Sequence, residues 1–243
     1  MTALRSSDTL ENGLPLPYAG LPYVDDVERF DPAGDAPLFA AIAEILIDAG
    51  LDDTFGVNLL HVHFTLAAGE IVWESHDRRT NSLSVTVCAR DSALSREGRP
   101  TSWRCLDGRW LPLAFARHGL DEAELARAAP AMERIGRLLE KAGQAGRFGL
   151  CLARGGLRSW PLRIHVERTD EAGRRQILAP EWAPLRDRGQ DLDTSWSFRP
   201  SLLARAGIVR NTGTRCKTKC KTTCLVGSVH GPWHDGKEHK KEV

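Results

Sequence analysis

The sequence contains no run of apolar residues close to the ~20 that a membrane-spanning helix needs, so we expect no membrane partner. Its first residues, Met1–Asp8, lack the apolar core of a secretory signal peptide, which favours a cytoplasmic protein. In a reducing compartment, cysteines are more often thiols or metal ligands than disulfides. We therefore expect no disulfide framework, and we expect Cys88, Cys105 and Cys151, which lie singly in apolar or strand-like segments, to be small buried residues.

Motifs of the common nucleotide-binding and hydrolytic enzymes are also missing. No strand-like segment is followed by G-x-G-x-x-G, and the chain contains no G-x-x-x-x-G-K-[ST], G-x-S-x-G or H-E-x-x-H. These absences disfavour nucleotide-dependent enzymes and the common hydrolases, and they leave open whether the protein is an enzyme. No internal repeat is evident, which disfavours repeat architectures.

What is present is an ordinary globular composition. Of the 243 residues, 42% are hydrophobic and 27% are charged, and the formal net charge is +1. A chain of this length can bury a sizeable core. We expect three parts: an extended leader (1–34), a globular domain (35–200), and a linker with a basic, Cys/His-rich tail (201–243).

Helical spacing predicts two main helices in the globular domain. The first has Asp35 as its N-cap, Pro37 just inside it, and Gly50 after its last turn. The second spans Asp121–Ala142, and Pro130 should kink or split it.

Alternation of apolar and polar residues predicts the strands. The expected strand segments are 55–66, 71–73, 81–89, 103–113 with a turn at Asp107-Gly108, 148–152, 162–167 and 176–178. Residues 181–200 are expected to form a loop. Short turns between strands favour antiparallel pairing. The predicted class is α+β, a mostly antiparallel sheet with two main helices and a disordered C-terminal tail.

The tail holds the densest group of metal-ligand residue types. Cys216, Cys220 and Cys224 are separated by three residues each, and His230 and His234 follow. Thiolate and imidazole suit soft or borderline metals, so the predicted cofactor is zinc or copper. Three thiolates and one of these histidines would complete a tetrahedral site. The leading hypothesis is a soluble binding or interaction module whose tail binds such a metal.

Two other interpretations of the tail stay open. From Arg215 onward the sequence has seven basic and three acidic residues, so the tail could be a solvated basic terminus with incidental cysteines. Trp233 is the only aromatic residue of the tail that could stack on a base, which disfavours a nucleic-acid partner. Threonine also closely precedes each tail cysteine. In this respect residues 211–230 resemble the cores of lanthionine-forming peptides, which implies a precursor or substrate protein modified by a partner enzyme.

His61-Val62-His63 is a second candidate metal site. On the predicted strand 55–66 the two histidines point the same way, about 7 Å apart, which suits two ligands of one metal. Glu70, Glu74 and His76 could supply further ligands across the predicted hairpin, and Glu74 is the candidate third ligand or base. An HxH pair followed by a glutamate resembles the cupin superfamily, and this resemblance implies a metal-dependent enzyme with a cupin-like barrel or sheet cleft. Alternatively, both histidines lie on a solvent-facing or half-buried sheet face.

Arg163, His165 and Glu167 form a third group, at alternating positions of one predicted strand. Such a row could contact an anionic ligand. We expect instead an exposed face of an antiparallel sheet with paired charges.

Overall fold

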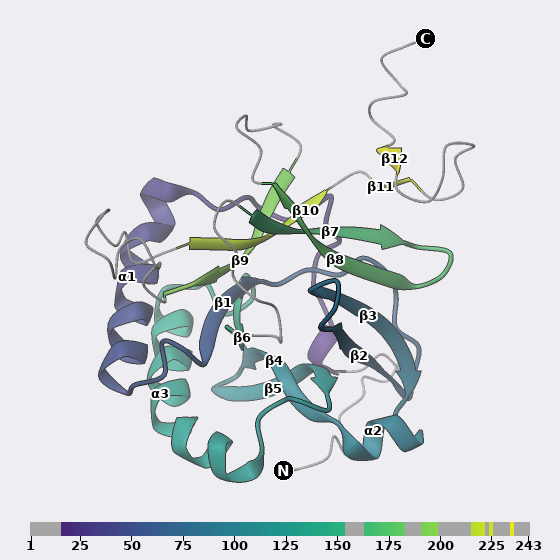
Figure 1. Ribbon diagram of the computed structural model, residues 1–243. Coiled ribbons are helices and arrows are strands. Elements are labelled where there is room, and N and C mark those ends of the chain that lie inside the picture. Colours follow the sequence, from purple (N-terminus) through teal and green to yellow (C-terminus); the bar gives the residue numbers. More distant parts are fainter. Residues whose placement is uncertain are drawn as a thin grey trace.

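A computed structural model describes residues 16–153, 163–182, 191–198, 215–221, 224–225 and 234–235, and from 215 onward it describes the backbone alone. The centre of the fold is a sheet that closes on itself (Figure 1). In order around the sheet, its strands are β1 (Phe55–Leu59), β6 (Phe148–Leu152), β4 (Arg99–Leu106), β5 (Arg109–Ala116), β2 (Glu70–Asp77), β3 (Ser82–Ala89), β8 (Arg175–Trp182), β7 (Arg163–Asp170), β10 (Arg215–Lys221) and β9 (Asp191–Ser197). β9 pairs with β1 and completes the circuit.

The sheet is mixed. β2 pairs with β5 and β7 pairs with β10 in parallel, whereas the other neighbouring strands are antiparallel. Two short strands, β11 (Cys224–Leu225) and β12 (His234–Asp235), pair separately. The α+β class predicted from the sequence is confirmed in this coarse form. Among the described residues, no helix combines the length and apolar character that crossing a bilayer requires.

Two long helices, α1 (Pro32–Asp48) and α3 (Glu122–Lys141), lie side by side against one side of the sheet (Figure 1). A short helix, α2 (Ala93–Glu97), and a 3-10 turn, η2 (Leu16–Tyr18), complete the described helical elements. The main core lies between the two long helices and β1, β6 and β9. Its centre is aromatic: the ring of Phe39 lies 5.1 Å from that of Phe148 and 5.2 Å from that of Trp196.

The start of α1 differs from the prediction. Asp31, not Asp35, is the N-cap, and its carboxylate accepts hydrogen bonds from the backbone N–H groups of Ala33 and Gly34. Asp35 lies inside the helix, where it is buried and ion-paired with Arg147. The sequence offers an Asp shortly before a Pro at both places, so the local pattern is ambiguous. The predicted end is right, since the chain leaves the helix through Gly50 at φ +64°.

The second helix begins as its sequence predicts. Asp121 and Glu124 form a capping box, in which each side chain accepts from the other residue's backbone N–H. The prediction that Pro130 could split this helix is wrong, because α3 continues through it as one element. Proline removes only one backbone donor. Buried side chains on both sides, including Ala128 and Met132, hold the helix on the core.

Three strand boundaries also differ from the predictions. β1 ends at Leu59, so His61 and His63 follow the strand instead of lying in it. Residues 191–197 form β9, although they were expected to be loop. Residues 215–221, assigned to the tail, form β10 between β7 and β9. The hairpin turn at Asp107-Gly108 is confirmed, with both residues at positive φ.

Candidate metal centre

The segment that carries His61 and His63 is held by backbone hydrogen bonds on both sides. The Leu60 N–H donates to the Arg147 carbonyl, 2.8 Å away, just before β6. Val62 forms an isolated parallel bridge with Tyr23 in the leader. These contacts fix the backbone on both sides of His61 without extending β1. The two imidazoles are therefore positioned by long-range contacts and not by the alternation of a strand.

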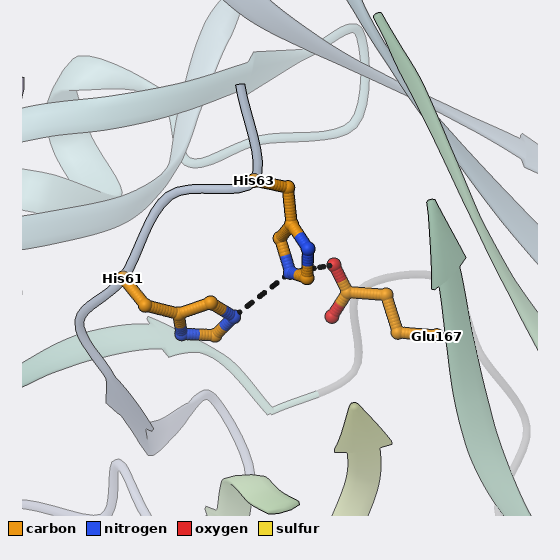
Figure 2. Close-up of side chains that lie close together, drawn as sticks. All are labelled: His61, His63 and Glu167. Carbon is orange, nitrogen blue, oxygen red and sulfur yellow. Dashed lines mark hydrogen bonds and ion pairs between the residues drawn. The ribbon is translucent and has the colours of Figure 1, made fainter. Parts of the chain in front are cut away.

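Three side chains converge here (Figure 2). Nε2 of His61 lies 3.0 Å from Nε2 of His63, which lies 3.0 Å from Oε1 of Glu167 on β7. One ligand atom from each residue lies within 4.8 Å of the other two, so this group could hold a metal ion. His63 and Glu167 are buried, while His61 is half-buried.

The outer nitrogen of each imidazole has its own partner. Nδ1 of His61 lies 2.9 Å from the Leu59 carbonyl, and because a carbonyl only accepts, this nitrogen must donate. Neutral His61 therefore turns an unprotonated Nε2 toward the other two groups. Nδ1 of His63 lies 2.8 Å from the Thr169 hydroxyl on β7. Such outer hydrogen bonds orient the histidine ligands of metal sites.

Glu167 is the member of this group that sequence reasoning missed. The row at alternating positions of β7 was expected to be exposed, and this interpretation is wrong for His165 and Glu167, each 7% exposed. Thr169 continues the same face and is also buried. His165 contacts the Asn81 carbonyl at 3.0 Å and so does not join the metal group. The alternating positions of His165 and Glu167 already placed both side chains on one face of the strand. Because the residues of this row are charged or polar, a solvent-facing row was the simpler interpretation.

Electrostatics favour a neutral imidazole at His61 and an ionised carboxylate at Glu167. Burial, with a smaller contribution from His63, lowers the pKa of His61 to about 4. Burial alone would raise the pKa of Glu167, but the charge and hydrogen bond of His63, together with His61, outweigh it and hold the pKa below its usual value. These are the protonation states in which both side chains donate electron pairs to a metal.

Glu74, the third ligand expected from the sequence, is not among the three converging groups. It lies on β2 and pairs with Val85 of β3. Burial raises its pKa to about 7, Thr101 lowers it, and the charge of Glu167 raises it further. Glu70, at the start of the same strand, instead forms an ion pair with Arg174.

For the tail site, the structure describes only backbone. Cys216 and Cys220 lie in β10, Cys224 in β11 and His234 in β12, while His230 lies outside the described residues. β10 runs beside β7, and Cys220 is the register partner of Glu167. The strand that carries Glu167 thus neighbours the cysteine-rich segment.

Comparison of the chain with models of known protein families, with curated proteins and with solved structures finds no match. The chemistry of the site therefore rests on its own geometry. Two imidazole nitrogens and one carboxylate oxygen form a donor set typical of first-row divalent metals.

Proposed function

We propose that this protein is a metal-dependent enzyme whose ion is bound by His61, His63 and Glu167. The observation that carries the proposal is the convergence of these three donor atoms within 4.8 Å, with the outer nitrogen of each imidazole already held by another group. Three protein ligands leave coordination positions for water and substrate, as in catalytic rather than structural zinc sites. An ion at this point would polarise a substrate oxygen or activate a water molecule.

A single hydrogen on Nε2 of His63 accounts for the close approach of the three side chains less completely than a bound metal ion does. Nε2 of His61 and the Glu167 carboxylate are both acceptors, and both approach the vicinity of His63 Nε2. One hydrogen on that nitrogen can point at only one of them with good geometry. A divalent cation satisfies all three electron pairs at once. With bonds of 2.0–2.1 Å, ligand atoms around tetrahedral zinc lie about 3.3 Å apart, close to the two distances of 3.0 Å that His63 Nε2 makes here.

The donor set narrows the choice of metal. Imidazole and carboxylate bind zinc, iron(II), cobalt and nickel, whereas copper(I) prefers thiolate and thioether. Two histidines and one carboxylate with open positions form the ligand set of both non-haem iron and catalytic zinc sites. We therefore propose a first-row divalent ion, with zinc or iron(II) as the candidates to measure.

Elemental analysis of the purified full-length protein tests the proposal. We expect about one divalent ion per chain in the wild type and loss of that ion in His61→Ala and Glu167→Gln. Glu70→Gln is the matched carboxylate control, because Glu70 is ion-paired with Arg174 and is not in the group. Circular dichroism would check that each variant is folded. Full metal content in both folded ligand variants would refute the proposal.

The tail remains a second proposal, favoured by the position of β10 beside β7. An interaction module with a zinc or copper site at the tail cysteines would lose metal when Cys216, Cys220 and Cys224 become Ser and keep it in His61→Ala. Substitution is a cleaner test than truncation, because β10 pairs with both β7 and β9 and its removal would open the sheet. Loss of water from tail threonines, seen by intact mass after co-expression with a partner enzyme, would instead support a modified substrate protein.

A further inference from the structure

Val62, which separates the two histidines of the proposed metal centre, is held by the leader. Its N–H donates to the Pro22 carbonyl, 2.9 Å away, and its carbonyl accepts from the Val24 N–H at 3.0 Å. Tyr23, between these two residues, is the register partner of Val62 in the parallel bridge. We call residues 17–30 of the leader the strap. Both backbone hydrogen-bonding groups of Val62 are therefore bound to the strap, which holds the segment that carries the histidines.

Two arginines hold the ends of the strap through its backbone carbonyls. Arg104 of β4, which is 7% exposed, donates from Nη1 to the Ala19 carbonyl at 2.6 Å and to that of Pro17 at 3.2 Å. Arg147, just before β6, donates from Nη2 to the Arg29 carbonyl at 2.6 Å. The carbonyl of Arg147 also accepts a backbone hydrogen bond from the segment that carries the histidines. Arg147 therefore links the strap to that segment a second time.

Between its two ends the strap has few buried side chains. Of residues 20–29, Val24 alone is buried, and the others are half-buried or exposed. The side chain of Tyr23 is 46% exposed, and its hydroxyl forms a hydrogen bond of 2.6 Å with Oγ1 of Thr65 in an exposed position. Segments with little buried apolar surface and exposed hydrogen bonds open locally at a small cost in free energy. The middle of the strap can therefore detach while the sheet stays folded.

We propose that the strap gates the proposed metal centre, so that the ion enters and leaves when the strap releases Val62. With the strap bound, the backbone that carries His61 and His63 is fixed. With the strap detached, this backbone can carry both imidazoles away from Glu167, which comes from β7 (Figure 2). Weakening the strap favours opening equally with and without the ion, so uptake and release change by the same factor and the affinity stays the same. The inference rests on the proposed metal centre and adds control of metal exchange.

Zinc is the probe. Its release is measured by adding an excess of a chromophoric chelator to the zinc-loaded full-length protein, and its uptake by mixing metal-free protein with zinc in a stopped-flow instrument. Tyr23→Phe and Thr65→Val each remove the same exposed hydrogen bond of the strap. We expect each variant to release and take up zinc about 3- to 10-fold faster than the wild type, with an unchanged Kd. The double variant should be no faster than either single variant, because the same hydrogen bond is lost in all three.

Thr80→Val is the matched control, because it removes an exposed side-chain hydrogen bond in the turn between β2 and β3. Its zinc exchange should equal that of the wild type. Wild-type rates of release and uptake in folded Tyr23→Phe and Thr65→Val would overturn the inference. Weaker zinc binding at an unchanged uptake rate would also overturn it, because the strap would then hold the ligands without gating the site, while the metal centre itself would stand. Normal zinc content in both His61→Ala and Glu167→Gln would instead refute the proposed function.

Discussion

Replacing Thr169 by valine tests whether His63 is held as a metal ligand. The hydroxyl of Thr169 lies 2.8 Å from Nδ1 of His63, and Thr169 is only 2% exposed. Valine keeps the shape of threonine and removes the hydroxyl. Groups that orient metal-bound histidines contribute about 10–100-fold to metal affinity. Since a buried site offers little room for replacement water, we expect the upper half of this range, about 2–3 kcal/mol.

Competition with a chromophoric chelator measures this change in affinity directly. Thr169→Ser keeps the hydroxyl and should restore most of the affinity. Thr86→Val is the matched control. Val85 lies on the face of Thr169, because Val85 pairs with Gln176 and Gln176 pairs with Thr169. Thr86, the next residue of β3, therefore lies on the opposite face of the sheet. Its metal affinity should equal that of the wild type.

The result that would refute the reasoning is wild-type affinity in folded Thr169→Val. Thr169 would then stabilise an apo-like hydrogen-bond chain, and His63 would need no orientation to bind the ion. Urea unfolding of the metal-free variant separates the two effects. A lost buried hydrogen bond costs about 1–3 kcal/mol with or without metal, whereas the additional loss in metal affinity appears only in the titration.

Three further predictions concern stability. Burial raises the pKa of Glu74 from 4.5 to about 7, so its contribution to the stability of the metal-free protein is complete below pH 4.5 and is lost as the pH rises through 7. The loss is at most about 3 kcal/mol, and the free energy of unfolding in urea should depend less on pH in Glu74→Gln than in the wild type. Asp35→Asn should cost about 3 kcal/mol in urea unfolding, because the largely buried guanidinium of Arg147 loses its nearer carboxylate and keeps only that of the exposed Glu28, 3.6 Å away; an unchanged midpoint would contradict this. Asp121→Ala should lower the melting temperature by the equivalent of about 1 kcal/mol through loss of the α3 cap, and no shift would show that the cap is not needed.

Local signals predicted much of the secondary structure but less of the site. The capping box at Asp121 and the turn at Asp107-Gly108 are confirmed because each depends on residues adjacent in sequence. The histidine pair was recognised as a candidate site, although the strand expected to present it ends at Leu59. Glu74 was named as a candidate ligand on sequence proximity, whereas Glu167 is the carboxylate that lies beside the two histidines in the structure.

The segment from 191 to 197 is a strand that the local sequence pattern did not predict. Its polar residues favour a loop in isolation, and it becomes β9 because β1 and β10 supply its hydrogen-bond partners. Strand formation there depends on neighbours elsewhere in the chain, which a local pattern does not contain.

By itself, the amino-acid sequence determined the α+β class, the C-terminal cap of the first helix, the start of the second, and the presence of two histidines suited to a metal. Those features follow from periodicity, capping and composition, which act over a few residues. Only the tertiary structure decided that Glu167 joins the histidines and that Thr169, 106 residues from His63 in sequence, contacts it. The reason is that closing the sheet brings β7 to the segment after β1. There the two histidines hold the pKa of Glu167 below its usual value, whereas burial raises the pKa of Glu74 to about 7.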